Sequence, residues 1–463
     1  MTDFALVQQD DLDRLTEMLA VLAQGFNNLP HAEPMQTDQT AMRRTLEQVA
    51  RLMHDNYPYA HPLYAGQMLK PPHPVARIAY QAAMWINPNN HALDGGRASS
   101  TLEKQAVAGI ATMFELHTHL GHLTSSGTLA NLEALWIARE THPSLCVASS
   151  AQAHYTHARI SSVLALVHET IPADDQGRMS LPALEALAKR GQLGTVIATA
   201  GTTSFGNVDP IADIVELAQE YGFRVHVDAA YGGYFRLASR LQPTVARHFD
   251  AISAADSIAI DPHKHGLQPY GCGCVLFRDP AVGRHYRHDS PYTYFTSDDL
   301  HLGEISLECS RAGAAAVALW ATQQTLPLVR DGAFATSLDN CLDAAQTLHQ
   351  HLSDSEWFTP LRTPELDIIV WAVNAADATT ASSLAQRVFD LAAVNDLHLA
   401  LIRVDAAQLP PSMNIDPGAG PVTCLRSCLM KPEHLVWVPQ IWQRLTNAVQ
   451  AAVAELPAAA RQA

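Results

Sequence analysis

Lys264 stands in a setting that suits amine chemistry. It lies between His263 and His265, and the apolar runs on either side predict strands over Ser257–Ile260 and Cys274–Phe277. A lysine held in a short loop between strands can lose its proton more easily than a surface lysine, and a neutral amine can attack a carbonyl. A solvated loop lysine has the same local sequence, so Lys264 alone does not establish a catalytic site.

Polar residues also follow the ends of other predicted strands. Asp228 directly follows "RVHV", while Thr203 and His154 come shortly after "GTVIATA" and "LCVAS". Parallel strands bring their carboxyl ends to one edge of a sheet, where such folds place ligands. Asp228 and Lys264 are about one strand–helix–strand step apart, so we expect these side chains at the same edge. Each residue by itself is equally consistent with ordinary turn chemistry.

A helix predicted from "SSGTLANLEALWIAR" begins with small residues, among them Gly127 and Thr128. Such a start leaves backbone N–H groups free at the positive end of the helix, where a phosphate binds well. An ordinary N-cap explains the same residues. Together with Asp228 and Lys264, however, they supply an anion, a phosphate site and an amine. A pyridine cofactor that carries a phosphate and an aldehyde needs this set.

The elements that must position these residues alternate along the chain from Leu120 onward. Strands are expected in "LCVAS", "LALVHE", "GTVIATA", "RVHVDA", "SIAID" and "CGCVLF", with helices between them. Apolar strands that alternate with helices predict a mostly parallel sheet covered on both faces. Residues 1 to about 60 have helical spacing. From about Leu361, strand-like runs mixed with helices predict a smaller α+β unit.

Composition narrows the class of protein. The 463 residues are 48% hydrophobic and 16% charged, which is typical of a globular protein with more than one packed unit. A net charge of -16 argues against nucleic acid or an anionic membrane as a partner. No apolar run reaches the roughly 18 residues that a membrane span needs, and the N-terminus lacks the features of a signal peptide.

Cysteines and histidines outside these motifs are interpreted as structural. Seven cysteines at irregular spacing suit reduced thiols and a cytoplasmic location better than a disulfide framework. The motif "HTHLGH" has Glu115 as its only close carboxylate and no thiolate near it. We therefore expect no metal site there.

The ordered motifs "SSGTLAN", "AQAHY", "AGTTSFGNVDP", "HVDAAYGG" and "DPHKHG" resemble those of the group II pyridoxal-phosphate-dependent amino acid decarboxylases. That family includes aromatic amino acid, tyrosine, glutamate and diaminobutyrate decarboxylases. The resemblance covers residues 55 to 435. One departure is His265, which stands where a tryptophan is common in the family.

The resemblance implies pyridoxal 5'-phosphate as cofactor and a role for each motif. Lys264 would bind the cofactor covalently, with His263 beside it, and Asp228 would pair with the pyridine nitrogen. His154 would stack on the ring, supported by Asp209.

Further implied contacts come from Thr203, at the hydroxyl side of the ring, and from Gly127 and Thr128, at the phosphate. The physical chemistry agrees with these roles, because a carboxylate beside the ring nitrogen favours its protonated form. A protonated ring accepts the electron pair that remains on Cα when CO2 leaves.

The stretch "HDSPYTYFTSDD" resembles a family loop in which a tyrosine donates a proton to Cα. Tyr292 fits this role better than Tyr294, and the choice between these neighbours stays open. Proton donation at Cα separates decarboxylation from transamination.

The fold implied is the aspartate-aminotransferase-like type I fold, with a large seven-stranded, mainly parallel sheet domain. We expect an N-terminal helical segment over residues 1–90, a large cofactor-binding domain over 91–325 and a small α+β domain over 326–463. A homodimer with active sites at the interface is implied, in which the N-terminal helices wrap the partner.

The predicted reaction converts an L-amino acid to a primary amine and CO2. Aromatic residues that could line the substrate pocket, Tyr59, Tyr64 and Trp85, favour an aromatic substrate. An acidic substrate such as glutamate or aspartate would need an arginine, and Arg97, Arg311 or Arg426 could supply one. Diaminobutyrate as substrate, an aldehyde-forming decarboxylase or aminotransferase, and a catalytically silent cofactor-binding protein are the other interpretations.

Overall fold

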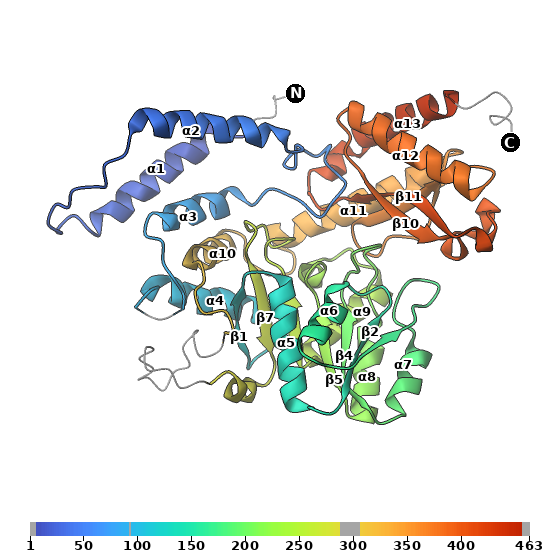
Figure 1. Ribbon diagram of the computed structural model, residues 1–463, viewed down its shortest axis with the longest axis horizontal. Coiled ribbons are helices and arrows are strands. Elements are labelled where there is room, and N and C mark those ends of the chain that lie inside the picture. Colours follow the sequence, from blue (N-terminus) through green and yellow to red (C-terminus); the bar gives the residue numbers. More distant parts are fainter. Residues whose placement is uncertain (1–5, 92–93, 288–305, 456–463) are drawn as a thin grey trace.

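The large sheet carries the site. The computed structural model describes residues 6–91, 94–287 and 306–455 (Figure 1). Its seven-stranded sheet has the order β1-β7-β6-β5-β4-β2-β3. These strands are β1 (Leu120–Thr124), β7 (Gly273–Phe277), β6 (Ser257–Ile260), β5 (Arg224–Asp228), β4 (Leu193–Thr199), β2 (Cys146–Ser150) and β3 (His168–Ile171).

Neighbouring strands pair in parallel from β6 through β5, β4 and β2 to β3. Strand β7 pairs antiparallel with both of its neighbours, β6 and β1. In the register of the parallel part, Asp228 lies opposite Thr199 on one side and Ala259 on the other. Every residue of β4, β6 and β7 is buried. This burial explains why these strands read as continuous apolar runs in the sequence.

Helices pack on both faces of this sheet, and Figure 1 shows α5 on one side of it. Their bounds are α3 (Pro74–Met84), α4 (Arg97–Met113), α5 (Gly127–Thr141), α6 (Thr156–Val163), α7 (Leu181–Ala188), α8 (Ile211–Tyr221), α9 (Pro243–Asp250) and α10 (Gly313–Thr325). The predicted fold class, a type I α/β fold with a mainly parallel seven-stranded sheet, is confirmed.

The chain after α10 forms a second, smaller layer. Its four-stranded sheet has the order β10-β11-β9-β8 and is antiparallel throughout. Its elements are α11 (Ala333–Ser353), β8 (Phe358–Pro360), β9 (Ile368–Val373), α12 (Ala378–Val394), β10 (Ala400–Asp405), β11 (Pro421–Cys428) and α13 (His434–Ala454). Short 3₁₀ helices cover Met53–Asp55, Gly233–Leu237, Ala251–Ala254, Pro280–His285, Ala406–Gln408, Pro411–Met413 and Pro417–Ala419.

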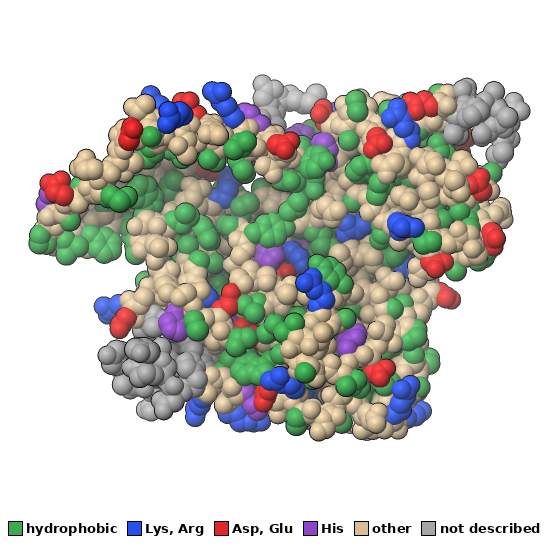
Figure 2. Space-filling model, viewed as in Figure 1, with side chains coloured by type: hydrophobic (Ala, Val, Ile, Leu, Met, Phe, Trp, Pro, Cys, Tyr) green, Lys and Arg blue, Asp and Glu red, His purple; other side chains and the backbone are tan. Residues whose placement is uncertain are grey.

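Two helices precede these layers, α1 (Gln9–Gln24) and α2 (Gln39–Leu52), and neither has a buried residue. Figure 1 shows them projecting at one end above α3, and Figure 2 shows hydrophobic side chains exposed along this projection. No helix among the described residues is long and apolar enough to cross a membrane.

Strand β1 is absent from the sequence predictions. Its residues, "LGHLT", include a glycine and a histidine, which weaken the apolar pattern. His122 in this strand is buried, with its Nε2 atom 2.9 Å from Glu133 Oε2 and its Nδ1 atom 2.8 Å from the carbonyl oxygen of Leu123. Pairing with a buried carboxylate explains how a histidine sits inside this sheet.

Candidate active site

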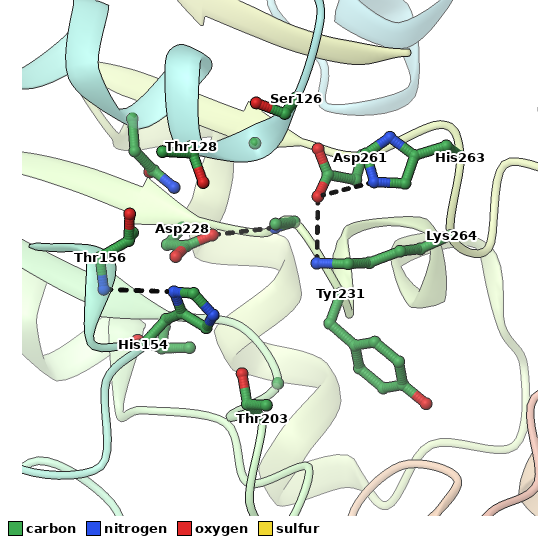
Figure 3. Close-up of a pocket in the computed structure, with 15 residues that line it drawn as sticks. Ser126, Thr128, His154, Thr156, Thr203, Asp228, Tyr231, Asp261, His263 and Lys264 are labelled. Atoms are coloured by element: carbon green, nitrogen blue, oxygen red, sulfur yellow. Dashed lines mark hydrogen bonds and ion pairs between the residues drawn. The ribbon is translucent and has the colours of Figure 1, made fainter. Parts of the chain in front are cut away.

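One pocket collects the polar residues at the carboxyl edge of the large sheet (Figure 3). It is lined by all the predicted cofactor-site residues: Gly127, Thr128, His154, Thr203, Asp228, His263 and Lys264. Further lining residues are Ser126, Asn131, Thr156, Thr199, Gly201, Ala230, Tyr231 and Asp261. Figure 3 shows the Lys264 and His154 side chains pointing into the same space from opposite sides.

Lys264 is held in the turn that follows β6. Its Nζ atom lies 3.0 Å from Asp261 Oδ2, and its backbone N–H donates to the Asp261 carbonyl. His263 Nε2 lies 3.5 Å from the same carboxylate oxygen, while its Nδ1–H donates to the carbonyl oxygen of Cys272 at 2.7 Å. The lysine therefore has a defined direction toward the pocket and an anionic neighbour.

Asp228 is the last residue of β5, and its buried side chain lines the pocket. His157 Nε2 lies 2.8 Å from its Oδ2 atom, and the backbone N–H of Ala230 donates to its Oδ1 atom at 3.1 Å. Burial alone raises the pKa of this carboxyl, but the hydrogen bond with His157 and the nearby Lys264 outweigh it, so the pKa lies below its usual range. Asp228 is consequently a carboxylate at neutral pH.

The start of helix α5 forms the opposite wall. Ser126 is the N-cap, and its side-chain oxygen accepts the backbone N–H of Leu129 at 3.4 Å. Gly127 packs so closely that a Cβ atom there would come within 2.6 Å of Asp261 Oδ2. A side chain at Gly127 would therefore displace the carboxylate that Lys264 contacts. The helix start presents its positive end to the pocket.

His154 and Thr203 enter from loops beyond β2 and β4. His154 Nδ1 accepts the backbone N–H of Thr156 at 3.3 Å, and burial lowers the pKa of this histidine. The carbonyl of Thr203 accepts a hydrogen bond from Arg426 Nη2 at 2.6 Å. Both side chains border the pocket, as the sequence predicts.

Asp209 is not placed as the sequence predicts. Its two carboxylate oxygens accept the backbone N–H groups of Met179 and Thr199, at 2.7 and 2.8 Å. These contacts hold it at the end of β4, and among the described contacts it does not support His154. Burial raises the pKa of Asp209 to about 7. Tyr292 and Tyr294 lie outside the residues that the structure describes.

Several pocket residues were not predicted. Asp261 lies three positions before Lys264 in "DPHKHG", and a carboxylate so close to a candidate lysine is a signal that could have been used. His157 contacts Asp228 across 71 positions of the chain, for which the sequence contains no comparable signal.

The pocket residue Asn131 contacts a buried histidine that does not line the pocket. His226 Nε2 lies 2.7 Å from Asn131 Oδ1, and His226 Nδ1 lies 2.9 Å from Ser257 Oγ. Burial lowers the pKa of His226 to about 3, so the ring is neutral. A neutral His226 that accepts from Ser257 donates its Nε2–H to Asn131, which leaves the Asn131 amino group to face the pocket.

This set of groups fits pyridoxal 5'-phosphate. The cofactor has a phosphate for the start of α5, an aldehyde for the Lys264 amine and a ring nitrogen for the Asp228 carboxylate. The Oδ1 atom of Asp261 is buried and has no hydrogen-bond partner among the described residues, so it can accept from a bound group.

The fold and pocket together are those of a pyridoxal phosphate enzyme of fold type I. Residues 99–373 match the family model described as the pyridoxal-dependent decarboxylase conserved domain. The chain therefore belongs to the pyridoxal-dependent decarboxylase family and is a pyridoxal-phosphate-dependent amino acid decarboxylase. The predicted family, cofactor and enzyme class are confirmed.

Curated relatives differ in their substrates. An L-tyrosine decarboxylase of Enterococcus faecium is 28% identical over 72% of this chain and 70% of its own length. A probable L-tyrosine/L-aspartate decarboxylase of Methanocella arvoryzae is 30% identical over 67% of this chain and 80% of its own. An L-2,4-diaminobutyrate decarboxylase of Rhizobium meliloti is 36% identical over 45% of this chain and 44% of its own.

Solved structures share the fold. The crystal structure of Oryza sativa TDC with PLP and tryptamine has a TM-score of 0.77 at 16% identity, covering 97% of this chain and 99% of that one. The crystal structure of mouse CSAD has a TM-score of 0.75 at 19% identity, covering 94% and 91%.

Proposed function

We propose that this decarboxylase acts on an aromatic L-amino acid and releases the primary amine and CO2. The observation that carries the proposal is a group of packed aromatic rings, Tyr57, Tyr59, Tyr64 and His398, in a segment tied to the pocket. Curated relatives that are named L-tyrosine decarboxylase support the same substrate class.

The aromatic group is tightly packed. The rings of Tyr59 and Tyr64 meet edge to face with centroids 5.0 Å apart, and the rings of Tyr57 and His398 lie 4.8 Å apart. Aromatic rings prefer such edge-to-face neighbours by about 0.5–1.5 kcal/mol beyond their area burial. A substrate ring that reaches this group gains the same contacts.

Arg426 links this aromatic segment to the pocket. Its guanidinium donates through Nη2 to the carbonyl of Thr203 and through Nη1 to the carbonyl of Gly66, at 2.6 and 3.4 Å. Gly66 follows Tyr64 by two positions, so Arg426 joins the chain just after the aromatic residues to the loop that carries Thr203. Trp85, by contrast, is 76% exposed at the end of α3, and we assign it no role in the pocket.

Each residue of the pocket has a separate role in the proposed reaction. Lys264 would hold the cofactor covalently, Asp228 would face its ring nitrogen, and His154 would pack on the ring. Gly127, Thr128 and His263 would hold the phosphate side, and Thr203 would border the ring. The bound cofactor supplies a ring that accepts the electron pair left on Cα when CO2 departs. Tyr292 donates the proton that completes the amine.

An acidic amino acid is the second candidate substrate, because Arg426 is buried next to Thr203. Of the other arginines that the sequence suggested, Arg97 is exposed, and Arg311 already pairs with Glu103 at 2.8 Å. Arg426 is thus the arginine whose position favours this alternative.

CO2 release from purified enzyme tests the substrate class. The panel contains L-tyrosine, L-tryptophan, L-phenylalanine, L-aspartate, L-glutamate and L-2,4-diaminobutyrate. We expect the highest kcat/KM for an aromatic amino acid, and preference for an acidic one would instead support the role of Arg426. Tyr59→Ala should raise KM for the aromatic substrate, whereas the control Trp85→Ala should leave it unchanged.

We also propose that the enzyme is a homodimer. Met42, Leu46, Val49 and Met53 recur at helical spacing along and just after α2 and are 43%, 60%, 49% and 62% exposed. A contiguous apolar stripe of this kind marks an interaction surface. A second copy of the chain that covers α1 and α2 would remove it from water.

A further inference from the structure

A histidine behind the pocket contacts the carboxylate that faces the cofactor. His157 Nε2 lies 2.8 Å from Asp228 Oδ2, and the two side chains are only 1% and 7% exposed. His157 does not line the pocket itself. It lies in the first turn of α6, where its backbone N–H donates to the carbonyl of His154. One turn of chain thus places His154 in the pocket and His157 behind Asp228.

The other ring nitrogen of His157 shows where the proton lies. Its Nδ1 atom is buried and has no hydrogen-bond partner among the described residues. A buried N–H without an acceptor is costly, whereas an unprotonated ring nitrogen loses less on burial. The proton therefore belongs on Nε2, which donates to Asp228 Oδ2. The hydrogen bond therefore runs from His157 to the Asp228 carboxylate.

Two hydrogen bonds then fix the carboxylate. Ala230 N–H donates to Oδ1 at 3.1 Å, and His157 donates to Oδ2 at 2.8 Å. Because each oxygen has a donor on a different element, the carboxylate plane cannot rotate without breaking one of them. A carboxylate oxygen has more than one lone pair, so an oxygen bound by a backbone or imidazole donor can still accept from a further group.

We propose that His157 is a positioning residue of this decarboxylase, which orients the Asp228 carboxylate toward the cofactor's ring nitrogen and keeps it ionised there. A hydrogen bond from His157 stabilises the charged carboxylate against its own burial. Without that donor, Asp228 is free to turn and is more readily protonated, and a protonated carboxyl no longer attracts a protonated ring. This inference rests on the cofactor site and is independent of which amino acid is the substrate.

Cofactor binding without substrate tests the proposal. Apoprotein is titrated with pyridoxal 5'-phosphate, and its dissociation constant is followed by protein fluorescence. His157→Phe should weaken binding about 10-fold or more, because a hydrogen bond to a charged group is removed. His157→Gln should restore most of the affinity, since its side-chain amide can donate from a similar position.

His168→Phe is the matched control. His168 is half-buried on β3, and its Nε2 atom lies 2.9 Å from the hydroxyl of Ser149, with no hydrogen bond or ion pair to Asp228 among the described residues. We expect this variant to bind the cofactor with nearly the parent affinity. Parent affinity in His157→Phe would overturn the proposal, as would an equal loss in His168→Phe, which would indicate general damage to the fold.

A second measurement does not depend on any variant folding. The ¹⁵N chemical shifts of the His157 ring in the apoprotein should show a protonated Nε2 and an unprotonated Nδ1. A ring protonated only on Nδ1 could not donate to Asp228 and would overturn the proposal. Neither measurement involves an amino acid substrate, so an error in the proposed substrate class leaves both results unaffected.

Discussion

The cofactor pocket and the N-terminal helices differ in which side chains they leave in contact with water. In the pocket, the carboxylates of Asp228 and Asp261 are buried, and each has a side-chain partner, His157 for Asp228 and Lys264 for Asp261. Helices α1 and α2, in contrast, have no buried residue, and Met42, Leu46 and Val49 on α2 are exposed. The described lining of the pocket comes from one chain, whereas no described residue covers the apolar stripe of α2.

This difference indicates which side chains are buried within a single chain and which would need a second chain to cover them. Buried charges persist only when partners surround them, so the pocket must be assembled by the fold itself. Exposed apolar side chains gain roughly 25 cal/mol for each Å² removed from water, which a second chain can provide. Substitutions in the pocket should therefore lower turnover without changing dimer formation. Substitutions on α2 should weaken the dimer.

Removing the amine of Lys264 should have the largest effect. Lys264→Ala is expected to lower decarboxylation on the order of 10³-fold or more, because no other group replaces a covalent catalyst. Turnover is measured as CO2 release at saturating cofactor. The control is Lys189→Ala, which removes a surface lysine that pairs with Glu185. Near-parent turnover in Lys264→Ala would mean that the pocket has another role.

Tyr292 should come next, although it lies outside the described residues. Tyr292→Phe is expected to lower amine formation about 10²–10⁴-fold, since the proton for Cα loses its donor. Cofactor binding should stay unchanged. Amine and CO2 are quantified separately in air and under nitrogen. If Tyr294→Phe has this effect and Tyr292→Phe does not, the role belongs to Tyr294.

Neutralising Asp228 should cost somewhat less. Asp228→Asn keeps the shape of the side chain but removes the charge that we propose faces the ring nitrogen. Loss of one preorganised electrostatic group typically costs about 10²–10³-fold in turnover. Steady-state kinetics measure the loss, with Asp213→Asn, in a surface ion pair with Arg247, as the control. Equal activity in Asp228→Asn would leave Asp228 only a structural role.

Sequence patterns located much of the pocket and its scaffold. Lys264 and Asp228 were predictable because each lies at or shortly after the end of an apolar strand, and a parallel sheet brings strand ends together. Most of the buried strands could be located along the chain from their apolar runs. Strand β1 was not, because its glycine and buried His122 break the apolar pattern.

The partners behind the pocket could not be predicted in this way. His157 reaches Asp228 across 71 positions, and nothing in "AQAHYTHARI" shows which of its two histidines faces the pocket. Asp209 was expected at His154, but the backbone N–H groups of Met179 and Thr199 bind it instead. Such contacts depend on how elements pack, which periodicity does not encode.

The α2 surface should respond in the opposite way to the pocket. Leu46→Glu with Val49→Glu places two charges on the apolar stripe and should raise the dimer dissociation constant about 10-fold or more. Sedimentation velocity over a concentration series measures it. The control is Val394→Glu at the end of α12, where the valine is even more exposed than Leu46 and Val49. A parent that sediments as a monomer at all concentrations would contradict the proposed dimer.

Asp367 joins the two sheets and should give the smallest effect, on stability. It directly precedes β9, and its Oδ1 atom accepts the hydroxyl of Tyr231, a pocket residue, at 2.6 Å. Its Oδ2 atom lies 3.2 Å from Nε2 of His265, which follows Lys264. Asp367→Asn should therefore loosen the attachment of the lysine loop to the small sheet and cost about 1–3 kcal/mol in the free energy of unfolding at pH 7.

The free energy of unfolding at acidic pH tests whether the ionised Asp367 carboxylate is responsible. Burial alone raises the pKa of Asp367, but His265 and the hydrogen bond from Tyr231 outweigh it, so the folded-state pKa lies below the ordinary 3.8. A depressed pKa means that the unfolded chain binds more protons, so this stabilisation is present above 3.8 and is lost as the pH falls through the folded-state pKa. Urea unfolding should show parent and Asp367→Asn furthest apart near neutral pH and converging in acid. Asp175→Asn, which changes an exposed carboxylate in the turn between β3 and α7, is the control and should stay near the parent throughout. A constant gap between parent and Asp367→Asn down to strong acid would mean that packing, and not the ionised carboxylate, joins the two sheets at this point.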